Sequence, residues 1–186
     1  LIIYPTEACN FKCSFCMATE VPKSKNMTSD QVIDFYNRFN PSHIIVNGGD
    51  PLMMPPKFYE DILSVIQNGK TELALVTNLW GLYKNPEKWK DILTHKNVSV
   101  STSFQYGNER RVAKDIVYSE ELFREVLSVC SPILGYVPFF IATIGYENAG
   151  TMKQTVKLAK ELGTKCRVNP LKKLGRCGYS YPLFLY

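Results

Sequence analysis

The feature that most constrains the fold is a regular alternation of short apolar, β-branched runs with amphipathic segments along the 186-residue chain. Such alternation is typical of repeated strand and helix units, in which parallel strands pair and helices cover them. Six runs have the composition of strands, and they lie at residues 1–4, 43–46, 72–77, 98–103, 137–144 and 165–168. The pattern therefore predicts one α/β domain built on a six-stranded parallel sheet.

Helix signals fall between these runs. Thr28 followed by Gln31 has the sequence of a capping box, and apolar residues then recur at helical spacing. Ser119 is a typical N-cap residue, and the two glutamates after it suit the positive end of a helix. Helices are expected at residues 29–39, after the Pro55–Pro56 pair, at 86–93, after Ser119 and at 151–162. The last of these is expected to bury Met152, Val156 and Ala159.

Three of the six cysteines, Cys9, Cys13 and Cys16, are clustered in the loop that follows the first predicted strand. Their C-x3-C-x2-C spacing favours a metal site in a reducing compartment over a set of disulfides. Active sites of parallel α/β folds lie at the carboxyl ends of the strands, so this loop is well placed for chemistry. Cys130 and Cys166 fall in helix and strand patterns and are expected to be structural thiols.

Two kinds of metal centre fit this spacing. A zinc site usually needs a fourth protein ligand, for which the chain offers His43, His95 and Cys177. An iron–sulfur cluster held by three cysteines leaves one iron open to a small molecule. A zinc-binding or electron-transfer module is therefore the non-enzymatic alternative to a catalytic cluster.

The cysteine motif, with the aromatic Phe15 directly before its last cysteine, resembles that of the radical SAM superfamily. The resemblance implies a partial parallel (β/α)6 barrel that carries a [4Fe-4S] cluster on the three clustered cysteines. It also implies that S-adenosylmethionine (SAM) binds the open iron and is cleaved by one electron. The products would be methionine and a 5'-deoxyadenosyl radical, which abstracts a hydrogen atom from a substrate.

A second motif, Gly48, Gly49, Asp50 and Pro51, follows the second predicted strand. It resembles the GGEP motif of the same superfamily, which contacts the methionyl amino group, with Asp50 keeping the charge of the usual glutamate at shorter reach. Glycines at this place allow the backbone to approach a ligand closely. Because the two motifs follow different strands, a substitution at Gly49 is expected to impair SAM binding while sparing the cluster.

The resemblance also implies cofactor contacts at the later strand ends. Asn78, Ser103 and Gln105 stand where similar enzymes bind the ribose hydroxyls and the methionyl carboxylate, and Arg110 or Arg111 is positioned to pair with that carboxylate. Each of these polar residues is equally compatible with a solvated loop or a local cap. The implied adenine contacts are Phe15, Ile141 and Val168.

The resemblance covers residues 1–170 as the core domain and makes residues 171–186 the exit from the barrel. This exit is similar to that of enzymes with a cysteine-rich SPASM extension, in which Cys177 would be a first cluster ligand or a structural thiol. Such enzymes often modify peptides or proteins, so a peptide or protein substrate is expected. A small-molecule substrate and RNA modification are the alternatives.

Partners and location follow from the chemistry and the charge. The reduced cluster implies an electron donor such as flavodoxin or ferredoxin. The net charge of +5 is scattered among 17 acidic residues, which disfavours nucleic acid as a partner. No apolar run approaches the roughly 18 residues needed to span a bilayer, so no membrane association and a cytoplasmic location are expected.

Overall fold

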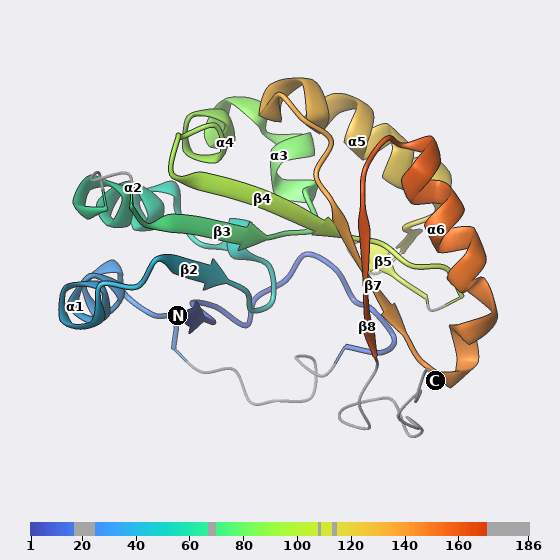
Figure 1. Ribbon diagram of the computed structural model, residues 1–186, viewed down its shortest axis with the longest axis horizontal. Helices are drawn as coiled ribbons and strands as arrows, with labels where there is room; N and C mark the ends of the chain where they lie inside the picture. Colours follow the sequence, from blue (N-terminus) through green and yellow to red (C-terminus); the bar gives the residue numbers. More distant parts are fainter. Residues whose placement is uncertain (17–24, 67–69, 108, 113–114, 171–186) are drawn as a thin grey trace.

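The computed structural model describes residues 1–16, 25–66, 70–107, 109–112 and 115–170. Six parallel strands form one sheet in the order β1-β2-β3-β4-β7-β8, and Figure 1 shows the sheet curving with the helices along its outer side. The predicted α/β partial barrel is thereby confirmed. The strands are β1 (Ile2–Ile3), β2 (His43–Val46), β3 (Glu72–Val76), β4 (Val98–Ser103), β7 (Phe140–Ile144) and β8 (Cys166–Pro170).

Five of the six helices, all except α3, fall close to their predicted positions. The helices are α1 (Ser29–Phe39), α2 (Pro56–Val65), α3 (Trp80–Lys84), α4 (Pro86–Leu93), α5 (Glu120–Leu134) and α6 (Met152–Glu161). The Thr28–Gln31 capping box is present, and the Ser119 side chain accepts a hydrogen bond from the backbone N–H of Leu122. Cys130 is fully buried in α5, as expected of a structural thiol. None of the helices among the described residues is long and apolar enough to cross a membrane.

One helix face was predicted wrongly. Val156 of α6 is 40% exposed, whereas Thr155, Leu158 and Ala159 are buried. These three residues follow helical spacing on one stripe, and Val156 lies beside that stripe rather than on it. The buried Thr155 was missed because its hydroxyl made it look polar, although that hydroxyl donates to the Thr151 carbonyl oxygen at 3.0 Å.

The two faces of the sheet carry different residues. Leu73, Leu75 and Phe140 are fully buried against the helices, each burial stabilising the fold by roughly 1.5–3 kcal/mol. Side chains alternate along a strand, so Ala74 and Val76 point to the opposite, concave face. The concave face is therefore the one that can receive a ligand.

A small antiparallel hairpin in the β4–α5 connection was not predicted. It consists of β5 (Arg111–Val112) and β6 (Ile116–Val117), and a single antiparallel bridge joins Val112 to Phe11 of the cysteine loop. Strands of two residues are too short to produce a recognisable alternation. The short helix α3, which follows β3 closely, and the 3-10 turns Pro51–Met53 and Tyr146–Thr151 were missed for the same reason.

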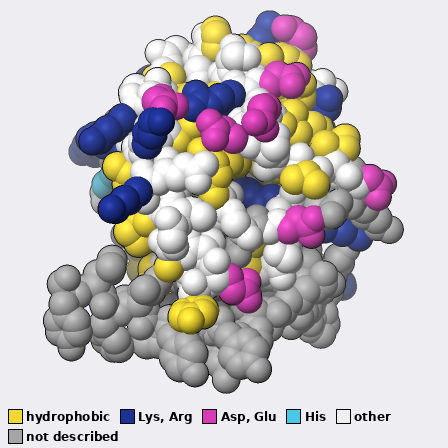
Figure 2. All heavy atoms as spheres, turned by 90° about the vertical axis from the view of Figure 1, so that its right-hand side faces the viewer, with side chains coloured by type: hydrophobic (Ala, Val, Ile, Leu, Met, Phe, Trp, Pro, Cys, Tyr) yellow, Lys and Arg dark blue, Asp and Glu magenta, His cyan; other side chains and the backbone are white. Residues whose placement is uncertain are grey.

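The surface carries charges of both signs. Figure 2 shows the face on the right-hand side of Figure 1, where Lys and Arg side chains lie interspersed with Asp and Glu. No patch of a single sign dominates this face. It therefore resembles the mixed surface of an ordinary globular protein more than a nucleic-acid interface.

Candidate active site

The loop that carries the cysteines lies directly against the glycine motif. The backbone N–H of Gly49 donates to the Thr6 carbonyl oxygen at 2.9 Å, and that of Asp50 donates to the Ala8 carbonyl oxygen at 2.8 Å. A Cβ atom on Gly49 would lie 2.2 Å from the Ala8 carbonyl oxygen, and one on Gly48 would lie 2.4 Å from that of Thr6. Gly48 also has a φ of +127°, which side-chain-bearing residues rarely adopt.

These contacts show why glycine is needed at both positions. The close approach is made to the backbone of the cysteine loop, immediately before Cys9. The structure therefore couples the two motifs, contrary to the expectation that Gly49 could be changed without affecting the cluster ligands.

The other side of the cysteine loop is held by the β4–α5 connection. Both the backbone N–H and the hydroxyl of Ser14 donate to the Glu109 carbonyl oxygen, at 3.0 and 3.2 Å. The Phe11 ring packs edge-on against Tyr118, with 4.8 Å between the ring centroids. Two residues of this connection, Glu109 and Tyr118, thus fix the course of the loop although they are far from the cysteines in sequence.

Asn78 ties the end of β3 to the cysteine loop. Its side-chain amide donates to Asn10 Oδ1 at 2.6 Å and lies 3.9 Å from Cys9 Sγ, and its own Oδ1 accepts from the Trp80 N–H at 2.9 Å. The predicted ribose ligand is thus already engaged within the protein. Through its hydrogen bond to Asn10, Asn78 holds the loop in place next to Cys9.

Asp50 is buried, with 1% of its surface exposed. Its carboxylate accepts hydrogen bonds from the N–H of Leu52 at 2.9 Å, the N–H of Asn78 at 2.7 Å and the hydroxyl of Thr77 at 3.0 Å. Burial raises the pKa of Asp50 to about 6, although these hydrogen bonds oppose the rise. The carboxylate is therefore mostly ionised at neutral pH, and it joins the ends of β2 and β3.

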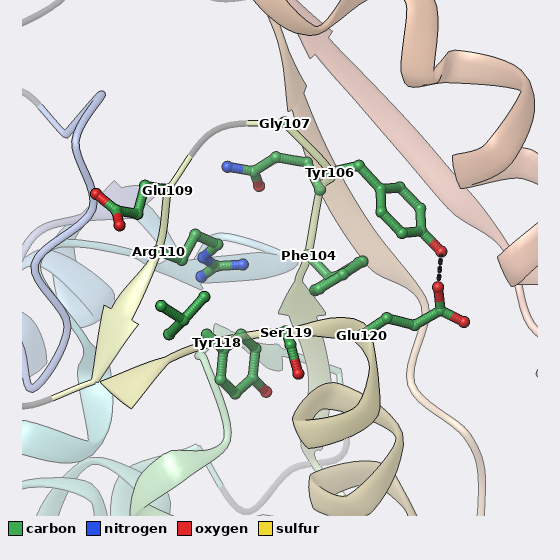
Figure 3. Close-up of a pocket in the computed structure, with 10 residues that line it drawn as sticks. Phe104, Tyr106, Gly107, Glu109, Arg110, Tyr118, Ser119 and Glu120 are labelled. Carbon is green, nitrogen blue, oxygen red and sulfur yellow. Dashed lines mark hydrogen bonds between the residues drawn. The ribbon is translucent and has the colours of Figure 1, made fainter. Parts of the chain in front are cut away.

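Arg110 is a buried cation beside the cysteines. Its guanidinium donates to the carbonyl oxygen of Ser103 and, at 2.9 Å, to the Ser103 hydroxyl. Its central carbon lies 5.3 Å from the centre of the Phe11 ring and 5.4 Å from that of Tyr118, within range of cation–π attraction. Figure 3 shows the side chain projecting toward Phe104 and Tyr118 from the Glu109 side of a neighbouring cavity of about 270 Å³.

The charges of Arg110 and Asp50 affect the pKa values of the neighbouring thiols. Burial raises the pKa of Cys13, and the hydrogen bond and positive charge of Arg110 oppose that rise. Cys9 is exposed to solvent, yet partial burial of its thiol by the surrounding protein and the negative charge of Asp50 raise its pKa to about 12. Metal binding must therefore displace the protons of these thiols.

A cavity of about 430 Å³ brings most of the predicted site residues together at the carboxyl ends of the strands. We call it the cysteine cavity. Its lining includes Cys9, Cys13, Phe15, Cys16, Gly48, Gly49, Asp50, Asn78, Ser103, Gln105 and Arg110. Gln105 is only 3% exposed, and neither its Nε2 nor the Nε of Arg110 has a hydrogen-bond partner among the described residues. Buried donors of this kind are costly unless a ligand satisfies them.

Three predicted residues do not line this cavity. Pro51 is buried in the 3-10 turn, and its carbonyl oxygen accepts from the Tyr59 hydroxyl at 2.7 Å. Ile141 lines a separate cavity farther down the concave face. Val168 pairs with Ala142, which is fully buried, so both face the helices.

Other lining residues were not assigned from the sequence. Tyr4, Val76, Thr143 and Asn169 all contribute to the cysteine cavity. Strand alternation was the signal that could have found two of them. A threonine in the apolar strand β7 and an asparagine next to Val168 both sit at positions that face the concave side.

The zinc alternative finds no support in the positions of the histidines. His43 begins β2 and His95 precedes β4, so both lie at the amino ends of strands, opposite the cysteines. Cys177, the other candidate for a fourth zinc ligand, lies outside the described residues. Three cysteines around one cavity fit a multi-iron cluster with an open iron.

Comparison with known proteins points the same way. The family model of the Radical SAM superfamily matches residues 3–159. The GTP 3',8-cyclase of Staphylococcus aureus (strain JH9) is 32% identical over 126 residues, which make up 58% of this chain and 36% of that protein. The GTP 3',8-cyclase of Vibrio atlanticus (strain LGP32) is 29% identical over 108 residues, 52% of this chain and 32% of that protein. The chain thus spans about a third of the length of these relatives.

Solved structures share the fold at low sequence identity. Streptococcus suis SuiB bound to the precursor peptide SuiA has a TM-score of 0.65 at 14% identity, covering 92% of this chain and 39% of that chain. SuiB bound to S-adenosylmethionine has a TM-score of 0.63 at 14% identity, covering 96% of this chain and 41% of that chain. At this identity the similarity is one of fold.

Proposed function

Because the chain belongs to the radical SAM superfamily, we propose that the cysteine cavity is its active site. One observation carries the proposal. Three cysteine thiols and two unpartnered buried donors line the same cavity at the carboxyl ends of parallel strands. The enzyme would hold an iron–sulfur cluster and an amino-acid ligand side by side there.

Members of this superfamily use a [4Fe-4S] cluster and SAM, which are therefore the cofactors of this enzyme. When bound, the reduced cluster would supply the single electron that cleaves SAM to methionine and a 5'-deoxyadenosyl radical. We assign the cluster to Cys9, Cys13 and Cys16. Arg110 contributes a fixed positive charge next to Cys13, which favours the thiolate form that a metal ligand needs.

The two buried donors without a partner among the described residues, Gln105 Nε2 and Arg110 Nε, are suited to bind the methionyl carboxylate. In this proposal the carboxylate accepts from Gln105 Nε2 and Arg110 Nε, while Ser103 holds the guanidinium in place. The backbone at Gly48 and Gly49 and the negative charge of Asp50 would face the methionyl amine. Phe15 remains the proposed adenine contact, whereas Ile141 and Val168 do not reach the cavity.

The substrate is proposed to be a peptide or a protein. The fold shared with SuiB, solved with a precursor peptide, supports this choice. A small molecule is the second candidate, because the higher sequence identity is to GTP 3',8-cyclases. A flavodoxin or ferredoxin is the proposed reductant. Residues 1–170 form the core in this proposal, and residues 171–186 lie outside the described residues.

Electron paramagnetic resonance (EPR) of the reduced, reconstituted protein tests the site. Addition of SAM is expected to perturb the cluster signal of the wild type, because the ligand binds next to the cluster. Gln105→Leu should keep its iron content but need about 10- to 100-fold more SAM for the same perturbation, since it loses a hydrogen bond to a charged group.

Gln154→Leu is the matched control, because Gln154 is exposed on the outer face of α6. It should behave as the wild type. A Gln105→Leu titration identical to that of Gln154→Leu would remove Gln105 from the site. A wild-type signal that SAM does not change would refute the proposed function itself.

A further inference from the structure

A second cavity, of about 310 Å³, lies on the concave face of the sheet and adjoins the cysteine cavity. We call it the sheet cavity. Asn47, Val76 and Asn169 line both cavities, so the two share a wall. Ile45, Ala74 and Arg167 also line the sheet cavity, and each precedes one of the three shared residues by two positions, on β2, β3 and β8. The sheet cavity therefore extends from the cysteine cavity toward the amino ends of the strands.

The sheet cavity exists because small residues occupy inward positions. In closed (β/α)8 barrels, bulky branched side chains fill the interior in layers. Here Ala74 of β3 stands opposite Ser99 of β4, and Val76 stands opposite Ser101. Ala74, Ser99 and Ser101 leave unfilled the space that larger side chains would occupy. The sequence thus keeps the concave face open directly beside the proposed active site.

Arg167 gives this cavity its charge. It lies on β8 opposite Ile141, and both side chains line the cavity. Among the described residues, Arg167 is the one charged side chain in the lining, and no ion pair is formed between it and a carboxylate.

The surroundings of Arg167 are partly apolar. Ile45, Phe139 and Ile141 also line the cavity. Arg167 is exposed, so its guanidinium is open to an anionic group that enters the cavity. Carboxylates and phosphates match its planar set of donors.

We propose that the sheet cavity receives the substrate and that Arg167 binds an anionic group on it, a carboxylate or a phosphate. This inference rests on the proposed function, because the adjoining cysteine cavity would generate the radical. The apolar wall would accommodate a hydrophobic or aromatic part of the same substrate. The substrate class is therefore an amphiphilic anion.

Binding of small probes to the reconstituted, SAM-loaded full chain tests this proposal. One pair of probes is the end-capped dipeptide of phenylalanine and glutamate and its glutamine counterpart. The other pair is phenyl phosphate and benzyl alcohol. Isothermal titration calorimetry is expected to show at least about tenfold tighter binding of an acidic probe than of its neutral counterpart, the size of a charge-assisted hydrogen bond. The acidic probe with the larger preference identifies the group as carboxylate or phosphate.

Arg167→Gln should abolish this preference. Arg38→Gln is the control, because it removes the same charge from an exposed position of α1 and should keep the preference. Arg167→Gln should also retain its iron and the EPR response to SAM, so its failure to bind anions would be distinct from failure of the active site. Equal binding of acidic and neutral probes to the wild type, absence of binding, or a preference that survives in Arg167→Gln would overturn the proposal.

Discussion

Cys9→Ala, Cys13→Ala and Cys16→Ala are each expected to leave the anaerobically reconstituted protein without a site-bound iron–sulfur cluster. Each change removes one of three ligands, and the described part of the chain offers no histidine or other cysteine in the lining of this cavity as a replacement. Iron and sulfide content, together with the visible absorption of the protein, measures the loss. The expected reduction is to the level of adventitious iron.

Cys130→Ala is the matched control for this series. Cys130 is fully buried in α5 and its thiol lies 3.9 Å from the Leu79 carbonyl oxygen, away from the cysteine cavity. This variant should be less stable, because it leaves a small cavity, but it should bind the wild-type amount of iron. Equal iron losses in all four variants would show that the three clustered cysteines are not the ligands.

Gly49→Ala is expected to lose cluster binding and SAM binding together. The new methyl group would lie 2.2 Å from the Ala8 carbonyl oxygen and 2.6 Å from that of Glu7, which are backbone atoms that cannot rotate away. The cysteine loop must therefore shift next to Cys9. Overpacking of this kind costs about 1–3 kcal/mol in stability. Thermal unfolding and iron content of the same preparation measure both effects.

Gly150→Ala provides the comparison, because a Cβ at Gly150 meets no atom within 4 Å. It should match the wild type in stability, iron content and response to SAM. A Gly49→Ala protein with full iron content and a defect only in SAM binding would contradict the coupling seen in the structure. It would instead support the simpler expectation that the two motifs act independently.

The sequence predicted the layout of the fold because that layout depends on local patterns. Alternation located all six strands of the main sheet, and the capping box placed the start of α1 at the correct residue. The spacing of the cysteines likewise identified the family. These signals are local in sequence, and tertiary packing did not override them.

Features that depend on contacts between distant segments were not predictable in this way. The glycine motif predicted that Asp50 contacts SAM, but it did not reveal that the Asp50 carboxylate also accepts hydrogen bonds from Leu52, Thr77 and Asn78. Val168 was chosen as an adenine contact for its hydrophobicity, but its register with Ala142 turns it toward the helices. Burial and register arise from the assembled sheet, so residue type alone could not reveal them.

The most direct test of the central claim is product analysis after anaerobic reduction with dithionite in the presence of SAM. We expect slow formation of 5'-deoxyadenosine and methionine even without substrate, and we expect it to depend on Cys9, Cys13 and Cys16. Liquid chromatography coupled to mass spectrometry distinguishes 5'-deoxyadenosine from S-adenosylhomocysteine. Formation of S-adenosylhomocysteine alone, without 5'-deoxyadenosine, would contradict the proposal that this protein cleaves SAM to a radical.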